Sequence, residues 1–332
     1  MNRRTFFGVA AGIAGLAVQA GATSSRSLPI IDTHIHLFDP RRPQGVPWPE
    51  KQDGILYQPA LPDRYRKVTS GLGVVGAIEI ECSPWLSDNQ WVLDVAARDP
   101  IIVGTVGNLE PGTADFRQHL ERFHRNPLFR GIRCGNLWGR NLAAQVAQPQ
   151  FISDLAALAD EGLEMDSANP DPALISAIVR LTDQVPRLRV VIDHLPQMEM
   201  PAELPARSAV QANLRELGQR PQVYVKVSEV LRRVDGRVPE ELSFYRATLD
   251  ELWDLFGPDR LMYGSDWPNS DQWGSYPQVL GVVRDYFTAK GSFVAEKFFW
   301  KNSLAAYRWV KRQESQPNRN VGSHVLSSTL IH

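Results

Sequence analysis

Two histidines two residues apart follow an apolar run near the start of the chain, in the segment that begins at Asp32. Because successive side chains of a strand point to opposite faces, the spacing predicts Asp32, His34 and His36 on one face and Ile31 and Ile35 on the other. An acid and two imidazoles buried without partners would destabilise the fold, so they need a metal ion, ion pairs or an aqueous pocket. Two imidazoles at the end of a strand can converge on one cation, so this pair is a candidate metal site.

One more histidine and one acid stand at the ends of later apolar runs. His194 ends the run VVIDH, and Asp266 ends the run MYGSD. The other histidines fall in a charged helical pattern or near the C-terminus: His119, His124, His324 and His332. We therefore expect His194 and Asp266 to join the first pair, with Asp266 as general base. Two simpler interpretations stay open, a hydrogen-bonded core histidine and a turn or helix-capping aspartate.

Charged residues also alternate with apolar ones in other strand-like runs. Glu79 and Glu81 share a predicted inward face, and Lys226 alternates with valines. Arg133 is the candidate for gripping a substrate carboxylate or polarised carbonyl, because a guanidinium matches such groups with paired donors. An ion pair of Arg133 with Glu79 or Glu81 is an equal alternative. We expect Arg133, Glu81 and Lys226 to contact substrate.

Tryptophans in the segments after the strands are candidate pocket walls. Trp85 and Trp267 are the predicted substrate contacts, and Trp48, Trp138 and Trp273 lie in comparable segments. Indole rings can stack on an apolar group or a sugar ring. They can equally pack on each other as a cover, and the sequence does not separate these two roles.

These residues require strands that end at one common edge, and the chain supplies eight. Apolar runs alternate with helical patterns between residues 29 and 310, which is typical of βα units. The strand candidates are Ile30–Leu37, Val74–Cys82, Ile101–Asn108, Phe129–Gly135, Leu163–Ala168, Leu188–Leu195, Val223–Val230 and Arg260–Trp267. A length of 332 residues suits a (β/α)₈ TIM barrel of about 250 residues with additions. The long Pro-rich loop Asp39–Leu61, which contains Trp48, is a candidate cover of the site.

The two ends of the chain differ from this domain in composition and in residue pattern. Residues 1–22 combine Arg3-Arg4 with a weakly apolar Gly/Ala stretch and small residues, which predicts a twin-arginine signal peptide and export, for example to the periplasm. Residues 311–332 are polar and aperiodic, which predicts a disordered tail. The formal net charge of -1 and the absence of a basic stripe argue against nucleic acid as a partner. After the N-terminus, no apolar run is long enough to span a membrane, so a small-molecule substrate is expected.

The sequence resembles the amidohydrolase superfamily, specifically the amidohydrolase-related branch that contains lactonases. The resemblance extends in order from about Pro29 to Trp309 and rests on several short motifs. These are Asp32–His36, Gly131–Arg133, Asp193–Pro196, Val225–Ser228, Tyr263–Pro268 and the closing segment Asn302–Tyr307.

The resemblance implies a TIM-barrel hydrolase that opens lactones, such as those of sugar acids or muconolactone-type compounds. It also implies that His34, His36, His194 and Asp266 hold one divalent metal, commonly zinc, although some members of the branch work without metal. A two-metal site is not expected, since strand four offers Arg133 in place of the bridging ligand of two-metal members. Two alternatives stay open, a decarboxylase of an unsaturated acid and an exported small-molecule binder without catalysis.

Overall fold

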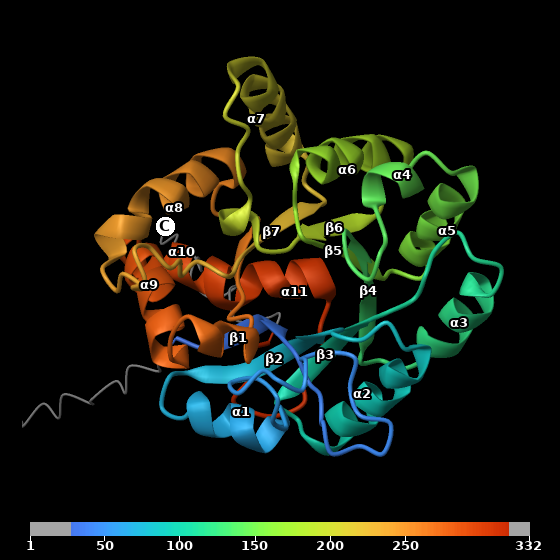
Figure 1. The fold of residues 1–332 in the computed structure, drawn as a ribbon, viewed down its shortest axis with the longest axis horizontal. Coiled ribbons are helices and arrows are strands. Elements are labelled where there is room, and N and C mark those ends of the chain that lie inside the picture. Colours follow the sequence, from blue (N-terminus) through green and yellow to red (C-terminus); the bar gives the residue numbers. More distant parts are fainter. Residues whose placement is uncertain (1–27, 319–332) are drawn as a thin grey trace, which may run out of the picture.

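Eight parallel strands in sequence order form the centre of the protein, seen here in a computed structural model that describes residues 28–318 (Figure 1). The strands are β1 (Ile30–Ile35), β2 (Val74–Ile80), β3 (Ile102–Gly107), β4 (Phe129–Gly135), β5 (Glu164–Ala168), β6 (Arg189–Ile192), β7 (Val223–Val227) and β8 (Leu261–Tyr263). Backbone bonds from His36 N to Trp267 O and from Asp266 N to His34 O, both 2.8 Å, join the two ends of the sheet. The predicted barrel is therefore confirmed.

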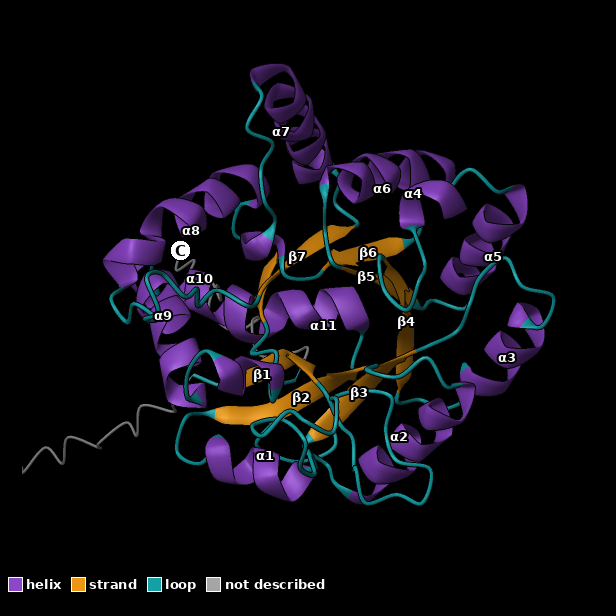
Figure 2. Cartoon of the chain, in the orientation of Figure 1, coloured by secondary structure: helices purple, strands orange, loops and turns teal. Residues whose placement is uncertain are grey.

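Helices form the outer layer of the barrel (Figure 2). They are α1 (Pro62–Val68), α2 (Leu86–Arg98), α3 (Phe116–Phe123), α4 (Leu142–Gln145), α5 (Pro149–Asp160), α6 (Pro172–Gln184), α7 (Leu204–Gln219), α8 (Leu242–Phe256), α9 (Tyr276–Ala289), α10 (Ser292–Glu296) and α11 (Asn302–Tyr307). Short turns of helix are η1 (Leu195–Gln197), η2 (Asn269–Gln272) and η3 (Lys297–Lys301). In α6, Asp171 caps the first turn, and apolar residues at helical spacing, such as Leu174 and Ile178, are buried against the sheet.

The last helix closes the N-terminal end of the barrel. In Figure 2, α11 lies across the barrel centre, and Tyr307 packs into the interior cluster that holds Ile31 and Met262. Asn302 donates to the backbone carbonyl of Leu261, the first residue of β8. With that end filled, the opposite end, where the strands finish, is the one left for a site.

The side chains of β1 do not lie on the faces that the sequence predicted. Its pairing with β2 shifts register between Asp32 and Ile35. Asp32 accepts hydrogen bonds from Tyr65 on α1 at 2.9 Å and Tyr276 on α9 at 2.8 Å, so it faces the outer helices. Ile31 packs in the barrel interior, whereas Ile35 belongs to the outer core. The prediction of one shared polar face was wrong, because an irregularity within a strand breaks the period of two.

The described part of the C-terminal segment, residues 311–318, packs against the rest of the domain. Arg312 donates to the backbone oxygens of Asp99 and Ile102, each at 2.9 Å. Gln316 is 1% exposed and donates to Val75 O at 3.0 Å. The predicted tail therefore does not begin at residue 311. Its remaining part, and the predicted signal peptide at residues 1–22, lie outside the described residues.

Two further features of the described residues concern membrane-spanning helices and cysteines. None of the described helices combines the length and apolar character needed to cross a membrane. Cys82 and Cys134 are buried and unpaired; Cys82 follows β2, Cys134 lies on β4, and β3 stands between these two strands.

Candidate active site

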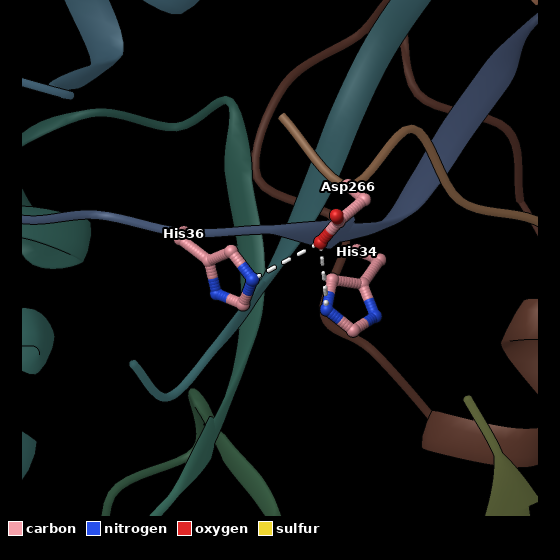
Figure 3. Close-up of side chains that lie close together, drawn as sticks. All are labelled: His34, His36 and Asp266. Carbon is pink, nitrogen blue, oxygen red and sulfur yellow. Dashed lines mark hydrogen bonds and ion pairs between the residues drawn. The ribbon is translucent and has the colours of Figure 1, made fainter. Parts of the chain in front are cut away.

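Two histidines and one aspartate meet where β1 and β8 end (Figure 3). His36 Nε2 lies 3.1 Å from Asp266 Oδ1, and His34 Nε2 lies 3.4 Å from the same oxygen. All three side chains are buried. The first and eighth strands are neighbours only because the barrel closes, so this contact requires the complete fold.

His194 joins the group from the end of β6, and an acid from the end of β7 adds to it. His194 Nε2 lies 3.9 Å from Asp266 Oδ1 and 4.0 Å from Glu229 Oε1. Asn269 Nδ2 donates to both acids, at 2.6 Å to Asp266 and 3.2 Å to Glu229. Sequence reasoning missed Glu229. Its position directly after Ser228 predicts the opposite face of the strand at a period of two, so the sequence pattern gave no signal for it.

In His36 and His194, the Nδ1 atom already contacts a protein oxygen, so Nε2 is the ring nitrogen that faces Asp266. His36 Nδ1 lies 2.8 Å from the carbonyl oxygen of Ile80, which can only accept, so Nδ1 carries the proton. His194 Nδ1 lies 2.8 Å from Ser228 Oγ. In neutral His36 the Nε2 lone pair then faces the carboxylate of Asp266. Two acceptors at hydrogen-bond distance repel, so a proton or a metal ion is needed between them.

The spacing of His34, His36 and Asp266 fits a single tetrahedral metal ion, and His194 lies beside this group. Bonds of about 2.0–2.1 Å place neighbouring ligand atoms roughly 3.3 Å apart. The separations of 3.1 and 3.4 Å from Asp266 Oδ1 to the first two histidines match this value, and His194 is only slightly farther. His34 Nε2 is buried and has no hydrogen-bond partner among the described residues. Lys226 Nζ lies 3.2 Å from His34 Nδ1 and can only donate, so neutral His34 carries its proton on Nε2, and a metal at this point would replace that proton. The donor chemistry of the group favours a metal here.

The backbone at the strand ends is held in an uncommon conformation. His194, Glu229 and Asp266 have φ of 52°, 49° and 60°, and the pocket residues Trp138 and Asn169 have φ of 58° and 54°. Left-handed backbone costs a non-glycine residue about 1–3 kcal/mol and gathers at functional sites. At the ends of five successive strands, this backbone conformation turns side chains into the pocket. The strand direction alone would not place those side chains there.

Charges in the site differ from their values in water. Burial by itself would raise the pKa of Asp266, but the imidazoles of His194 and His36 outweigh it and hold that pKa well below its usual range. Burial lowers the pKa of His194 to about 4, so this ring is neutral at neutral pH. Burial and the nearby Asp266 raise the pKa of Glu229 to about 9. The site therefore presents the ionised carboxylate of Asp266 beside the neutral imidazoles of His34 and His194.

A buried ion network lies beneath the pocket. Arg133 Nε donates to Asp193 Oδ2 at 3.1 Å, and Lys226 Nζ lies 2.9 Å from Asp193 Oδ1. Lys226 also pairs with Asp166 and is fully buried. The predicted contact of Lys226 with substrate is thus corrected, since its ammonium is used within the barrel. Arg133 does line the pocket, but its ion pair is with Asp193 and not with Glu79 or Glu81.

The open pocket above these groups encloses about 540 Å³, its mouth included. Trp48, from the predicted cover loop, and Trp138, from the loop after β4, form its aromatic walls. Glu81 lies one layer behind, where it accepts a hydrogen bond from Trp138 Nε1 at 3.1 Å. The prediction that Glu81 contacts substrate is therefore corrected: its carboxylate supports Trp138 in the pocket wall.

Two tryptophans predicted as substrate contacts lie elsewhere. Trp267 is fully buried, with its ring 5.3 Å from that of Tyr65. Trp85 directly precedes α2 and is not among the described residues that line the pocket. Both predictions are corrected, because an aromatic residue near a strand end can equally turn into the outer layer.

Comparison with known proteins identifies the family. The amidohydrolase family model matches residues 31–309. The chain belongs to the amidohydrolase family. An L-fucono-1,5-lactonase from Burkholderia ambifaria is 28% identical to this amidohydrolase over 249 residues, which cover 72% of this chain and 80% of that enzyme.

Solved structures show the same fold as this amidohydrolase. An amidohydrolase from Burkholderia multivorans with bound zinc superposes with a TM-score of 0.73 at 22% identity, covering 85% of this chain and 99% of that one. A putative 2-pyrone-4,6-dicarboxylic acid hydrolase from Pseudomonas putida gives a TM-score of 0.66 at 22% identity, covering 85% and 98% of the two chains. At these identities the likeness concerns the fold.

Proposed function

We propose that this amidohydrolase opens the lactone ring of a small hydroxy acid or sugar acid, with Asp266 as the general base. The observation that carries the proposal is the position of Asp266 Oδ1, which faces His34, His36 and His194 on the floor of an open pocket. An ionised carboxylate there can accept a proton from an attacking water. Similarity to lactonases supports the choice of a cyclic ester as substrate.

One divalent metal, with zinc as the first choice, would be held by His34, His36, His194 and Asp266. A metal bound there would polarise the carbonyl and lower the pKa of a bound water. The ring tautomer of His36, fixed by Ile80 O, keeps Nε2 free for this purpose.

Asp266 and Arg133 handle the proton of the attacking water and the negative charge that develops on the carbonyl oxygen. Asp266 takes one proton from water as the hydroxyl oxygen bonds to the lactone carbonyl carbon. Arg133, whose Nε and Nη1 are held by Asp193 and the backbone of Glu81, has Nη2 left for the developing oxyanion. The bond from carbonyl carbon to ring oxygen then breaks. Asp266 returns its proton to the leaving alkoxide, and the product is an open hydroxy acid.

The test is base uptake at constant pH on a panel of five- and six-membered lactones, with wild type and Asp266→Asn. Ring opening releases an acid and consumes base. We expect a fall of at least about a hundredfold in kcat for the variant, the effect typical of losing a general base, with an unchanged circular dichroism spectrum. Near-normal turnover by the Asn variant contradicts the assignment of Asp266. Release of carbon dioxide from unsaturated acids without lactone opening would indicate a decarboxylase, and binding without turnover a binder.

A further inference from the structure

One buried acid on β1 takes no part in the proposed reaction. Asp32 is fully buried and is not among the described residues that line the active pocket. Its side chain faces the helices outside the barrel, although His34, two residues later, faces the site. Burial of a carboxylate is unfavourable unless its oxygens are hydrogen-bonded, so the partners of Asp32 indicate what this acid holds together.

One oxygen of Asp32 joins the two chain segments that carry the centre of the site. Asp32 Oδ1 accepts from the backbone N–H of His34 at 3.2 Å and from the backbone N–H of Ser265 at 2.8 Å. Ser265 directly precedes Asp266. A single buried atom therefore ties the backbone of a candidate metal ligand on β1 to the residue beside the proposed general base.

The other oxygen of Asp32 is held by two helices of the outer layer. Asp32 Oδ2 accepts from the hydroxyl of Tyr65 on α1 at 2.9 Å and from the hydroxyl of Tyr276 on α9 at 2.8 Å. Both tyrosines are buried. The two hydroxyls and the two backbone N–H groups match the four acceptor positions of a carboxylate. Turning Asp32 would therefore break several hydrogen bonds at once.

The segment that Asp32 holds includes an unfavourable backbone conformation at Asp266. Asp266 has a left-handed φ of 60°, which persists in a non-glycine residue only where neighbouring contacts enforce it. The backbone N–H of Asp266 donates to His34 O at 2.8 Å, and Ser265 beside it is bonded to Asp32. These bonds fix how the two side chains meet, with Asp266 Oδ1 at 3.4 Å from His34 Nε2 (Figure 3).

We propose that Asp32 is a positioning residue, which sets the separation of Asp266 and His34 by holding the backbone beside each of them. Asp32 acts through these two residues and does not reach the pocket. The inference rests on the proposed function only for its effect on turnover, because the geometry of the site is measurable without substrate. The competing interpretation is that Asp32 stabilises the junction of β1 and β8 without affecting how the two side chains meet.

Three variants separate these interpretations. Asp32→Ala removes all four hydrogen bonds. Asp32→Asn removes the negative charge but keeps an oxygen for the two N–H groups and an amide that can donate to a tyrosine hydroxyl. Asp154→Ala is the matched control, because Asp154 on α5 is also fully buried and also accepts from a backbone N–H, that of Gly112 at 2.8 Å. All are compared at a temperature at which circular dichroism shows each variant to be folded.

Kinetics and metal affinity measure the consequence for the site. A displacement of about 1 Å can reduce turnover about a hundredfold, so we expect a fall of this size in kcat for Asp32→Ala, with KM little changed. Zinc affinity, measured by competition with a chromophoric chelator, should fall at least about tenfold, as is typical when a group behind a metal ligand is lost. Asp32→Asn should retain most of both properties, and Asp154→Ala should match wild type.

Nitrogen NMR of the histidine side chains measures the site without metal or substrate. The ring nitrogens of His34 and His36 face Asp266, so their signals depend on that separation. We expect these signals to shift in Asp32→Ala and to remain near their wild-type positions in Asp32→Asn and Asp154→Ala. If Asp32→Ala does not fold, Asp32→Ser, whose hydroxyl can bond one of the two N–H groups, should show a smaller shift of the same signals.

Several results would overturn the positioning role. Unchanged imidazole signals, zinc affinity and kcat in Asp32→Ala contradict it, and so do equal losses in Asp154→Ala. Equal shifts in Asp32→Asn and Asp32→Ala would show that the charge of Asp32 matters and its hydrogen bonds do not. Imidazole signals that respond as expected, in a protein that opens none of the lactones, would retain the positioning role and reject the proposed function.

Discussion

Gly264 of the eighth strand's end lies directly against His34, and a Cβ built on Gly264 would stand 2.9 Å from the Cβ of His34. The neighbouring Ser228 would be met at 3.3 Å. No side chain other than hydrogen fits there without moving His34. The chain just after β8 is thus in close contact with β1 at His34, which is a candidate metal ligand.

Gly264→Ala should therefore impair the site more than the fold. The added methyl group must push β1 away from β8, which we expect to cost about 1–3 kcal/mol in unfolding free energy and to lower lactone hydrolysis at least tenfold. Zinc affinity measured by competition with a chromophoric chelator should fall as well. Gly281→Ala on α9 is the control, because nothing lies within 4 Å of its Cβ position and alanine favours a helix. Equal activities of the two variants would show that the contact is unimportant.

Lys226→Met should destabilise the barrel through its buried carboxylates. Asp166 and Asp193 would lose their shared cation, and breaking a buried pair typically costs about 3–5 kcal/mol. Urea denaturation followed by tryptophan fluorescence measures this change. Lys301→Met, which breaks a partly exposed pair with Glu296, should cost less than about 1 kcal/mol. A similar small effect at Lys226 would mean that the network contributes little to stability.

Zinc should bind once per chain and stabilise the folded protein. Purified protein loaded with zinc and desalted should contain about one equivalent by elemental analysis, and a ligand that binds only the native state raises the melting temperature. His36→Ala should lose this stabilisation, because a tetrahedral site would be left with too few donors. His119→Ala, on the helix α3 away from the site, is the control. Full lactonase activity in protein stripped of metal would support catalysis by Asp266 and Arg133 alone.

The N-terminal segment is proposed to direct export through the twin-arginine route. A reporter fused after residue 30 should be recovered outside the bacterial cytoplasm, and replacement of both Arg3 and Arg4 by lysine should retain it inside. Fractionation followed by immunoblotting measures the distribution. Export that persists in the double-lysine variant, or that needs an unfolded reporter, would reject this route.

The sequence by itself determined the barrel and the central part of the site. Alternating apolar runs and helical patterns carry the order of the elements, and short motifs place His34, His36, His194 and Asp266 at strand ends. These features are local, so they can be read without knowing which strands become neighbours.

Only the tertiary structure decided which way the remaining polar groups face. The register shift in β1 sends Asp32 outward, β2 turns Glu79 toward α2, and Lys226 ends in an ion network. Left-handed backbone after β7 brings Glu229 into the site. Each of these orientations depends on barrel closure and on the packing of helices from distant parts of the chain. An alternation of apolar and polar residues along one strand cannot predict closure or helix packing.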